Sequence, residues 1–263
     1  MAGIPYREDE ESTYKVECVK KGKLLIGTSG WHYDHWKGPF YPSNLSSKKY
    51  LDYYIHVFST VEINRTFYSL PKRKVFLEYA KKVPISFIFA VKASRFITHT
   101  KRLKDPKIPL RRLFSRIDVL KSHLGPILFQ LPPHWKLNLE RFHLFLKALP
   151  KGYRYAFEFR DSSWWVEEIY DLLKQYNAGF CIYELEGIIT PSIATADFIY
   201  VRLHGPKGAY AGKYSLQSLK KWAHFFQQTA NKGKDIYCYF DNDEAGYAAI
   251  NAKTLNRLLK IKQ

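Results

Sequence analysis

Three pairs of polar side chains have a spacing that suits chemistry, because the two members of each pair lie two residues apart at the end of an apolar run. The pairs are Glu62 with Asn64, Glu158 with Arg160, and Arg202 with His204. Alternate residues of an extended strand lie on the same face, so each pair points one way and its apolar neighbours point the other way. Carboxylate, guanidinium and imidazole groups held together can transfer protons and bind an anion.

Further polar residues end other apolar runs of the chain, and they are Thr28, Lys92, Gln130 and Asp241. Strands that are covered on both faces are almost continuously apolar, so polar residues at one end of several strands indicate a site there. The predicted catalytic residues are Glu62, Glu158, His204 and Asp241. The predicted anion-binding residues are Lys92, Arg160 and Arg202.

Loops that follow the apolar runs add further candidates. His204 leads directly into Gly205, a position that suits a proton-transfer group, since histidine has an ordinary pKa of about 6.5. Loop 205–214 combines glycines with Lys207, so backbone NH groups and an ammonium ion could bind a phosphate. Aromatic side chains in these loops could stack on a nucleobase or a sugar ring, or simply hold the loops on the core. The complete set of predicted substrate-binding residues is Thr28, Trp31, Asn64, Tyr68, Lys92, His99, Gln130, Arg160, Trp164, Arg202, Lys207 and Asn242.

Two other interpretations of the charged set stay open at this point. Glu158, Arg160, Arg202 and Asp241 could form an internal ion-pair network without a catalytic role, although buried pairs contribute little stability over apolar substitutes. Carboxylates near His204 could also hold Mg²⁺ or Mn²⁺. The sequence has no HxH or HExxH pairing, and neighbouring Arg and Lys compete with a cation, so we expect no metal and no other cofactor.

The elements that must position these residues are eight short apolar runs, which predict buried strands at 24–29, 60–64, 86–92, 126–131, 155–160, 179–184, 198–204 and 236–241. Helical spacing predicts helices between them at 46–57, 74–82, 110–123, 139–148, 163–177, 215–231 and 245–261. This alternation implies a parallel sheet, and eight strands in a chain of 263 residues favour an α/β fold with a single TIM-like (β/α)8 barrel. The segment 184–197 lacks a clear helical pattern, so we expect an irregular sixth unit.

Composition sets the class of protein. The chain is 46% hydrophobic and 17% aromatic, which suits one large core. We assign the polar residues 1–22 to an N-terminal extension and residues 23–263 to one barrel domain. No apolar stretch approaches the roughly 18 residues of a membrane span, and the N-terminus lacks the apolar region of a signal peptide. The three cysteines, Cys18, Cys181 and Cys238, show no CxxC spacing. We therefore expect a cytoplasmic protein with reduced cysteines and no membrane partner, and we expect it to be a monomer.

A net charge of +18 is common in proteins that bind a polyanionic partner. Lysine and arginine side chains neutralise phosphates, and this drives binding to nucleic acids. The basic residues are scattered along the sequence, however, and Lys-rich surfaces also occur in heat-adapted proteins. Charge alone leaves both explanations open.

Several ordered blocks of the sequence resemble the YecE-like family, also called domain of unknown function 72. They are GTSGW at 27–31, WKGPFYP at 36–42, EINRTFYSLP at 62–71, FAVKASRFITH at 89–99, QLPP at 130–133, FEFRDSSW at 157–164, YVRLHG at 200–205 and YFDND at 239–243. The resemblance implies a TIM-like barrel and marks the same polar residues that strand alternation selects. This chain departs from the family pattern at Glu184, where members usually carry Asp.

The family has no settled activity, so the resemblance does not supply a reaction. Its barrel is similar in architecture to phosphodiester-cleaving repair endonucleases and to sugar isomerases, which is a fold analogy only. We expect an enzyme, of a hydrolase type, that acts on an anionic phosphate-bearing partner, either a small molecule or nucleic acid. The alternatives are a non-catalytic nucleic-acid-binding protein and a sugar-active hydrolase or isomerase.

Overall fold

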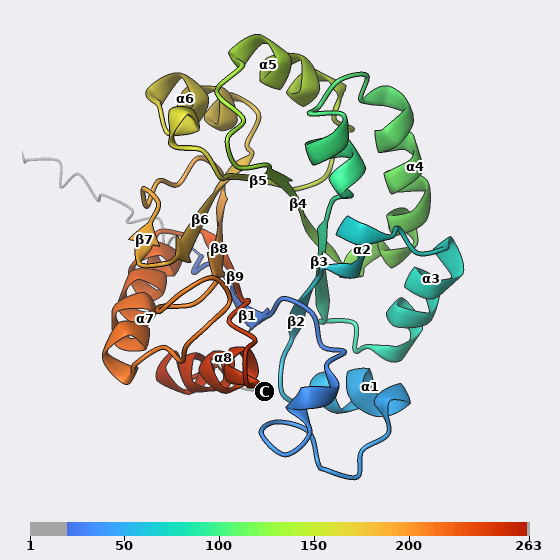
Figure 1. Ribbon diagram of the computed structural model, residues 1–263, viewed down its shortest axis with the longest axis vertical. Coiled ribbons are helices and arrows are strands. Elements are labelled where there is room, and N and C mark those ends of the chain that lie inside the picture. The colour runs from blue at the N-terminus through green and yellow to red at the C-terminus, as the bar shows by residue number, and fades with distance from the viewer. Residues whose placement is uncertain (1–19, 262–263) are drawn as a thin grey trace, which may run out of the picture.

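Eight parallel strands form a nearly closed barrel, and helices cover its outside (Figure 1). The computed structural model describes residues 20–261, so most of the predicted extension 1–22, including Cys18, lies outside the described residues. Around the barrel the strands follow the order β1-β9-β8-β6-β5-β4-β3-β2. The predicted fold class, an α/β TIM-like barrel, is confirmed.

The eight parallel strands agree closely with the eight apolar runs of the sequence, and a ninth, two-residue strand, β7, was not predicted. They are β1 (Leu24–Thr28), β2 (Thr60–Ile63), β3 (Ile88–Lys92), β4 (Leu124–Leu131), β5 (Tyr155–Phe159), β6 (Gly179–Leu185), β7 (Ile188–Ile189), β8 (Phe198–Leu203) and β9 (Asp235–Phe240). The helices are α1 (Tyr50–Tyr54), α2 (Arg65–Tyr68), α3 (Arg73–Lys82), α4 (Lys107–Ile117), α5 (Leu139–Ala148), α6 (Glu167–Gln175), α7 (Leu216–Asn231) and α8 (Tyr247–Leu258). Short 3-10 turns at 34–36, 47–49, 118–123 and 162–164, and a π-helical turn at 96–100, complete the loops.

Local sequence signals fix where several helices begin. The side chain of Asn138 accepts a hydrogen bond from the backbone NH of Arg141 at the start of α5, over 2.9 Å. Ser215 does the same for Ser218 at the start of α7, over 3.1 Å. Such N-caps satisfy a backbone NH that has no partner within the helix, and each is worth about 1 kcal/mol.

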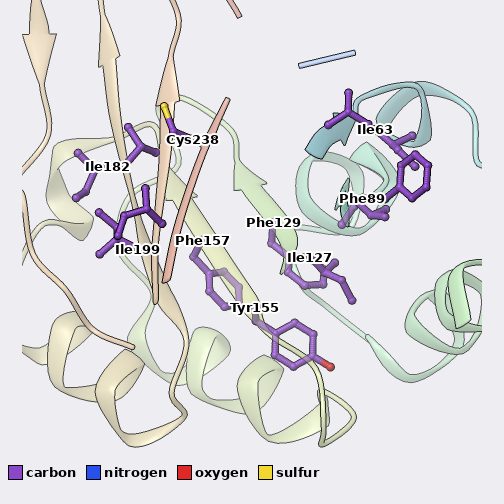
Figure 2. Packing of buried hydrophobic residues seen from close by; sticks show 14 of the residues in the cluster. Ile63, Phe89, Ile127, Phe129, Tyr155, Phe157, Ile182, Ile199 and Cys238 are labelled. Atoms are coloured by element: carbon purple, nitrogen blue, oxygen red, sulfur yellow. The ribbon is translucent and has the colours of Figure 1, made fainter. Parts of the chain in front are cut away.

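Alternation along the strands divides the core into two layers. One layer lies inside the barrel and contains small, aliphatic and aromatic side chains such as Ala90, Leu128 and Tyr239. The other lies between the strands and the helices, where Phe129 and Phe157 project from β4 and β5 (Figure 2). Burying each such side chain contributes about 1.5–3 kcal/mol, so this two-sided burial holds the strand directions that position the polar ends.

The sixth unit is irregular, as predicted. After β6 the chain turns back through β7, which pairs antiparallel with β6 at Glu184–Ile189. No helix occurs in the described chain between β7 and β8. Thr190 and Thr195 instead hold this segment, because their hydroxyl oxygens accept hydrogen bonds from backbone NH groups of β6, over 3.0 Å and 2.8 Å.

The barrel closes unevenly. β1 pairs with β9 in continuous register from Leu24 to Thr28, but it meets β2 through a single bridge between Ser29 and Glu62. There the NH of Gly30 donates to the carbonyl oxygen of Glu62 over 2.8 Å. The β1–β2 junction therefore lies at the end of the barrel where the polar residues gather.

Two remaining expectations concern cysteines and membranes. Cys181 lies inside the barrel and Cys238 in the outer layer, and both are buried free thiols. Burial raises the pKa of each well above the usual range, which keeps the thiols protonated.

Within residues 20–261, every helix is too short or too polar to cross a lipid bilayer.

Candidate active site

One arginine at the carboxyl end of the barrel joins three carboxylates. Arg202, fully buried at the end of β8, donates from Nη1 to Glu158 Oε2 over 2.9 Å. Its Nη2 donates to Glu62 Oε1 over 2.8 Å and to Asp241 Oδ2 over 3.0 Å. Since a guanidinium carries five NH donors in a fixed plane, it can serve three acceptors from three different strands.

Each glutamate of this cluster has further donors of its own. Glu158 accepts from Gln130 Nε2 over 2.9 Å and from Arg160 Nε. Burial acts to raise the pKa of Glu158, but Arg160 and Arg202 outweigh it and hold that pKa well below the usual range. Glu62 accepts from the hydroxyl of Tyr200 over 2.6 Å and from that of Ser29. These carboxylates are therefore held in fixed, multiply bonded positions.

His204 lies between a carboxylate and an arginine. Its Nδ1 is 3.0 Å from Asp241 Oδ2, and its Nε2 is 3.0 Å from Arg160 Nη2 and 3.3 Å from Arg202 Nη1. Nε2 also lies 3.4 Å from Glu158 Oε1. Arginine can only donate, so the shorter contact to Arg160 assigns Nε2 as an acceptor and places the ring hydrogen on Nδ1, where it is donated to Asp241. The ring of Tyr210, from the loop after β8, covers the imidazole edge-on at 5.5 Å.

Lys92 is the fourth basic side chain at this end of the barrel, and its surroundings differ from those of the two arginines. The side chain is 6% exposed, and Nζ lies 4.2 Å from the centre of the Phe67 ring. Burial, followed by the like charge of Arg202, lowers the pKa of the Lys92 ammonium to about 8. His99 packs against the same phenyl ring at 5.0 Å, and burial with the charge of Arg95 lowers its pKa to about 4. His99 is therefore uncharged at neutral pH.

A cavity of about 590 Å³ opens beside the charged cluster, between the loop after β1 and the segment 63–82. Trp31, Asn64 and Tyr68, all predicted to bind substrate, lie along it. Asn64 connects cavity and cluster, because its Nδ2 donates to Ser29 Oγ over 2.5 Å while its Oδ1 has no partner among residues 20–261. The volume is in the range of small-molecule binding sites.

Asp243, which follows β9, holds the loop after β1 at this end of the barrel. Its carboxylate accepts from Trp36 Nε1 and lies 3.1 Å from His35 Nε2. Burial raises the pKa of Asp243 to about 6, despite those two neighbours. The loop is thereby held beside Asp241 and the cluster.

Most of the site residues predicted from strand alternation lie close together in the structure. The structure gathers nine of these residues at the carboxyl ends of the strands: Glu62, Asn64, Lys92, Gln130, Glu158, Arg160, Arg202, His204 and Asp241. His99 is outside the charged cluster and packs against Phe67. Lys207 is exposed on loop 205–214.

Three predicted residues lie elsewhere. Thr28 points out of the barrel, where its hydroxyl is 2.9 Å from that of Tyr54, and the inward residue is Ser29. Trp164 is fully buried and stacks on Phe159 at 5.1 Å, so its ring cannot receive a substrate. Asn242 is also fully buried, and its Nδ2 holds the loop after β8 by donating to the carbonyl of Gly212 over 2.8 Å.

Sequence reasoning missed Ser29 and Tyr200, and it placed Tyr210 only among the loop aromatics around this end of the barrel. Ser29 and Tyr200 both bond Glu62, and Tyr210 covers His204. Tyr200 could have been found, because it lies two residues before Arg202 and shares its inward face. Its aromatic ring made it look like an ordinary core residue. The contact of Tyr210 with His204 could not be predicted, since a loop has no fixed alternation.

Glu184, the departure from the family pattern, does not belong to the cluster. It lies on the outward face of β6, where Trp222 Nε1 of α7 donates to its carboxylate over 3.3 Å. Burial raises its pKa. Its position indicates a role in attaching α7 to the barrel.

The carboxylates that could have served as metal ligands surround Arg202 instead. Within the described residues no group of three or more His, Cys, Asp or Glu side chains is arranged to share a metal ion. The absence of a cofactor stays a prediction.

The geometry of this barrel end can be compared with known proteins. Residues 25–263 match the family model described as "Protein of unknown function DUF72". The chain belongs to the DUF72 family. This confirms the resemblance carried by the sequence blocks, and the description of DUF72 assigns no reaction.

Some relatives of this DUF72 chain match most of its length, and another matches about half of it. UPF0759 protein YunF of Bacillus subtilis is 27% identical, covering 91% of this chain and 95% of YunF. UPF0759 protein YecE of Escherichia coli is 28% identical over 52% of this chain and 48% of YecE. The crystal structure of a DUF72 family protein from Thermotoga maritima is 31% identical, with a TM-score of 0.82 over 90% of this chain and 99% of that one.

Proposed function

We propose that this DUF72 chain is an enzyme that binds an anionic, phosphate-bearing substrate at the barrel mouth and transfers protons through His204. The observation that supports this most is the fixed imidazole, with Nδ1 at 3.0 Å from Asp241 and Nε2 held as an acceptor by Arg160. A carboxylate on one nitrogen sets the tautomer and leaves the other nitrogen able to take a proton. Barrel enzymes place their catalytic groups at this end of the strands.

The anion would be bound by Arg160 and Lys92 rather than by Arg202. Both terminal nitrogens of Arg202 are already engaged by carboxylates, and the side chain is fully buried. Arg160 and Lys92 each keep a donor that no other described residue uses, Nη1 and Nζ. Loop 205–214, after the seventh parallel strand, carries Lys207 and lies where barrels often bind a phosphate.

A non-catalytic nucleic-acid binder is the second candidate. Tyr68 is 78% exposed beside the cavity, and the basic residues Lys48, Arg65 and Lys82 border it. An aromatic face next to cations suits a base and its phosphate, and the net charge of +18 would add long-range attraction. On this account the charged cluster serves only to hold the barrel end.

A sugar-active hydrolase has less support. Glycosidases use one carboxyl group as an acid, which requires a raised pKa. Burial acts to raise the pKa of both Glu158 and Asp241, but arginine and histidine neighbours hold each one lower than usual. Both groups are therefore ionised at neutral pH and poorly suited to donate a proton.

The test uses His204→Asn, in which the new Nδ2 can still donate to Asp241 while the acceptor Nε2 is lost. Wild-type protein is first screened for turnover of phosphomonoesters, phosphodiesters and short oligonucleotides, and for a rise in melting temperature with phosphate ligands. We expect His204→Asn and Glu158→Gln to lose turnover and to melt near the wild-type temperature. His224→Ala, at an exposed position of α7, is the matched control that should keep full activity.

Two outcomes would contradict the proposal. If no phosphate ligand raises the melting temperature and nothing is turned over, the site does not bind this class of substrate. If both variants unfold at room temperature, the cluster is structural. Binding of single-stranded DNA that weakens steeply with salt and survives His204→Asn would favour the second candidate.

A further inference from the structure

Lys92 is the charged side chain at the barrel mouth that the ion-pair network does not use. Arg160 and Arg202 each bond at least one carboxylate of the cluster. For the Lys92 Nζ, by contrast, no acceptor within residues 20–261 lies at hydrogen-bond or ion-pair distance, and the face of Phe67 excludes water from one side. The Nζ atom retains some solvent accessibility, so a ligand can reach it.

The chemistry of this amine follows from its surroundings. Burial and the neighbouring guanidinium of Arg202 lower the pKa of Lys92 to about 8, so at neutral pH most of the amine keeps the charge that attracts an anion while a fraction is neutral and can act as a nucleophile. At pH 7 about one such amine in ten is neutral, against about one in 2,500 for an ordinary lysine with a pKa of about 10.4. Lysines desolvated next to another cation are known as nucleophiles.

We propose that Lys92 is a nucleophile that forms a Schiff base with an aldehyde or ketone carrying a phosphate or carboxylate group. This inference rests on the proposed anionic substrate class and deepens it. The lone pair of Nζ attacks the carbonyl carbon, forming a C–N bond as the C=O π bond breaks to give a carbinolamine. The carbinolamine oxygen then leaves as water, and both hydrogens of that water come from the amine nitrogen. The C=N bond that remains needs no oxidant or reductant.

The neighbouring groups suit this step. Arg160 keeps Nη1 available for the anionic group of the substrate, as above. His204 and Asp241 form a hydrogen-bonded pair that can relay the two protons from nitrogen to the leaving oxygen. Glu62, Glu158 and Asp241 lie close enough to Lys92 to act on its pKa, and they would stabilise the positive charge of a protonated Schiff base.

Reductive trapping tests the proposal on the full chain at pH 7. The protein is incubated with sodium cyanoborohydride and, separately, glyoxylate, pyruvate, dihydroxyacetone phosphate or glyceraldehyde 3-phosphate. Intact mass and peptide mapping then locate the adducts. We expect one adduct per chain, on Lys92, formed on the order of 100-fold faster than on exposed lysines, following the difference in neutral amine.

Two variants make the result specific. Lys92→Arg keeps the positive charge but removes the nucleophile, so the fast adduct should vanish. Lys221→Arg, at an exposed position of α7, should label at the wild-type rate. Melting temperatures of both variants show whether each is folded.

The inference is overturned if none of the four probes labels Lys92 faster than exposed lysines, or if folded Lys92→Arg labels like the wild type. Failure of the proposed function gives a different result. In that case phosphate ligands leave the melting temperature unchanged, and the fast adduct forms with the unphosphorylated probes glyoxylate and pyruvate just as readily.

Discussion

Replacing Arg202 by methionine is the sharpest test of how the cluster is held. The change leaves three buried carboxylates without their shared cation, while Glu158 keeps Arg160 and Asp241 keeps His204. Removing one partner of a buried ion pair costs about 3–5 kcal/mol. Since two of the three acids keep another base, we expect a loss in this range rather than three times as much. At about 3 °C per kcal/mol, the melting temperature should fall by roughly 9–15 °C.

The pH dependence of this loss identifies its cause. In the wild type, the pKa values of Glu158 and Asp241 are lowered, so their stabilisation is fully present above the unfolded pKa of about 4 and unchanged between pH 7.5 and 5. Without Arg202, burial would raise the pKa of the acids above the unfolded value. A raised acid pKa gives stability that is present at low pH and lost as pH rises. The deficit of Arg202→Met should therefore shrink at pH 5.

Urea unfolding followed by circular dichroism at pH 7.5 and pH 5 measures both effects. Arg154→Met is the control, because Arg154 pairs with Asp197 and Asp235 at the opposite end of the barrel and its side chain is 32% exposed. We expect a clearly smaller loss there, without recovery at pH 5. A loss below 1 kcal/mol for Arg202→Met, or a deficit that does not change with pH, would refute the reasoning.

Three further predictions concern other parts of the structure. Trp164→Ala should cost about 3–5 kcal/mol by urea unfolding because the ring is fully buried, yet leave phosphate-ligand affinity unchanged, and a variant that is stable but fails to bind would restore Trp164 to the site. Acid titration of the wild type should show stability falling below about pH 4, as the lowered pKa values of Glu158 and Asp241 imply, and this fall should be shallower in Glu158→Gln. Gly205→Ala should disturb the loop that covers the site and lower turnover more than melting temperature, because φ is +126° and a Cβ would lie 2.3 Å from the carbonyl oxygen of Ala211; unchanged turnover would contradict this.

The fold could be predicted because buried parallel strands leave a plain signature. Eight short apolar runs separated by helical spacing gave strand limits within a few residues of the eight parallel strands, and the one segment without a pattern proved irregular and holds the short antiparallel β7. Polar residues in such strands stand out, and period-two alternation gave their faces. Glu158 and Arg202 were found in this way because only one face of each strand could accept them.

The same reasoning failed where neighbouring residues of a strand do not differ in polarity, so that alternation does not show which one points inward. Thr28 and Ser29 are both polar and lie at the end of β1, and Gly27 offers no side chain to mark the inward face, so the sequence did not show that Ser29 points to Glu62. Trp164 was misjudged for a different reason. Its burial depends on Phe142 and Trp135, contacts that cross from one βα unit to another and leave no local pattern.

The uneven closure of the barrel has a consequence for how the chain matures. β1 is hydrogen-bonded along its length to β9, more than 200 residues later in the sequence, and it packs against its sequence neighbour β2 but pairs with it through a single bridge. During synthesis, β1 would wait without a partner strand until nearly all of the chain had emerged from the ribosome. Ser29 and Glu62 form that bridge, but the cluster they belong to also needs Arg202 and Asp241 from the last two strands of the barrel. A chain truncated before β9 would therefore lack both the closed barrel and the complete cluster.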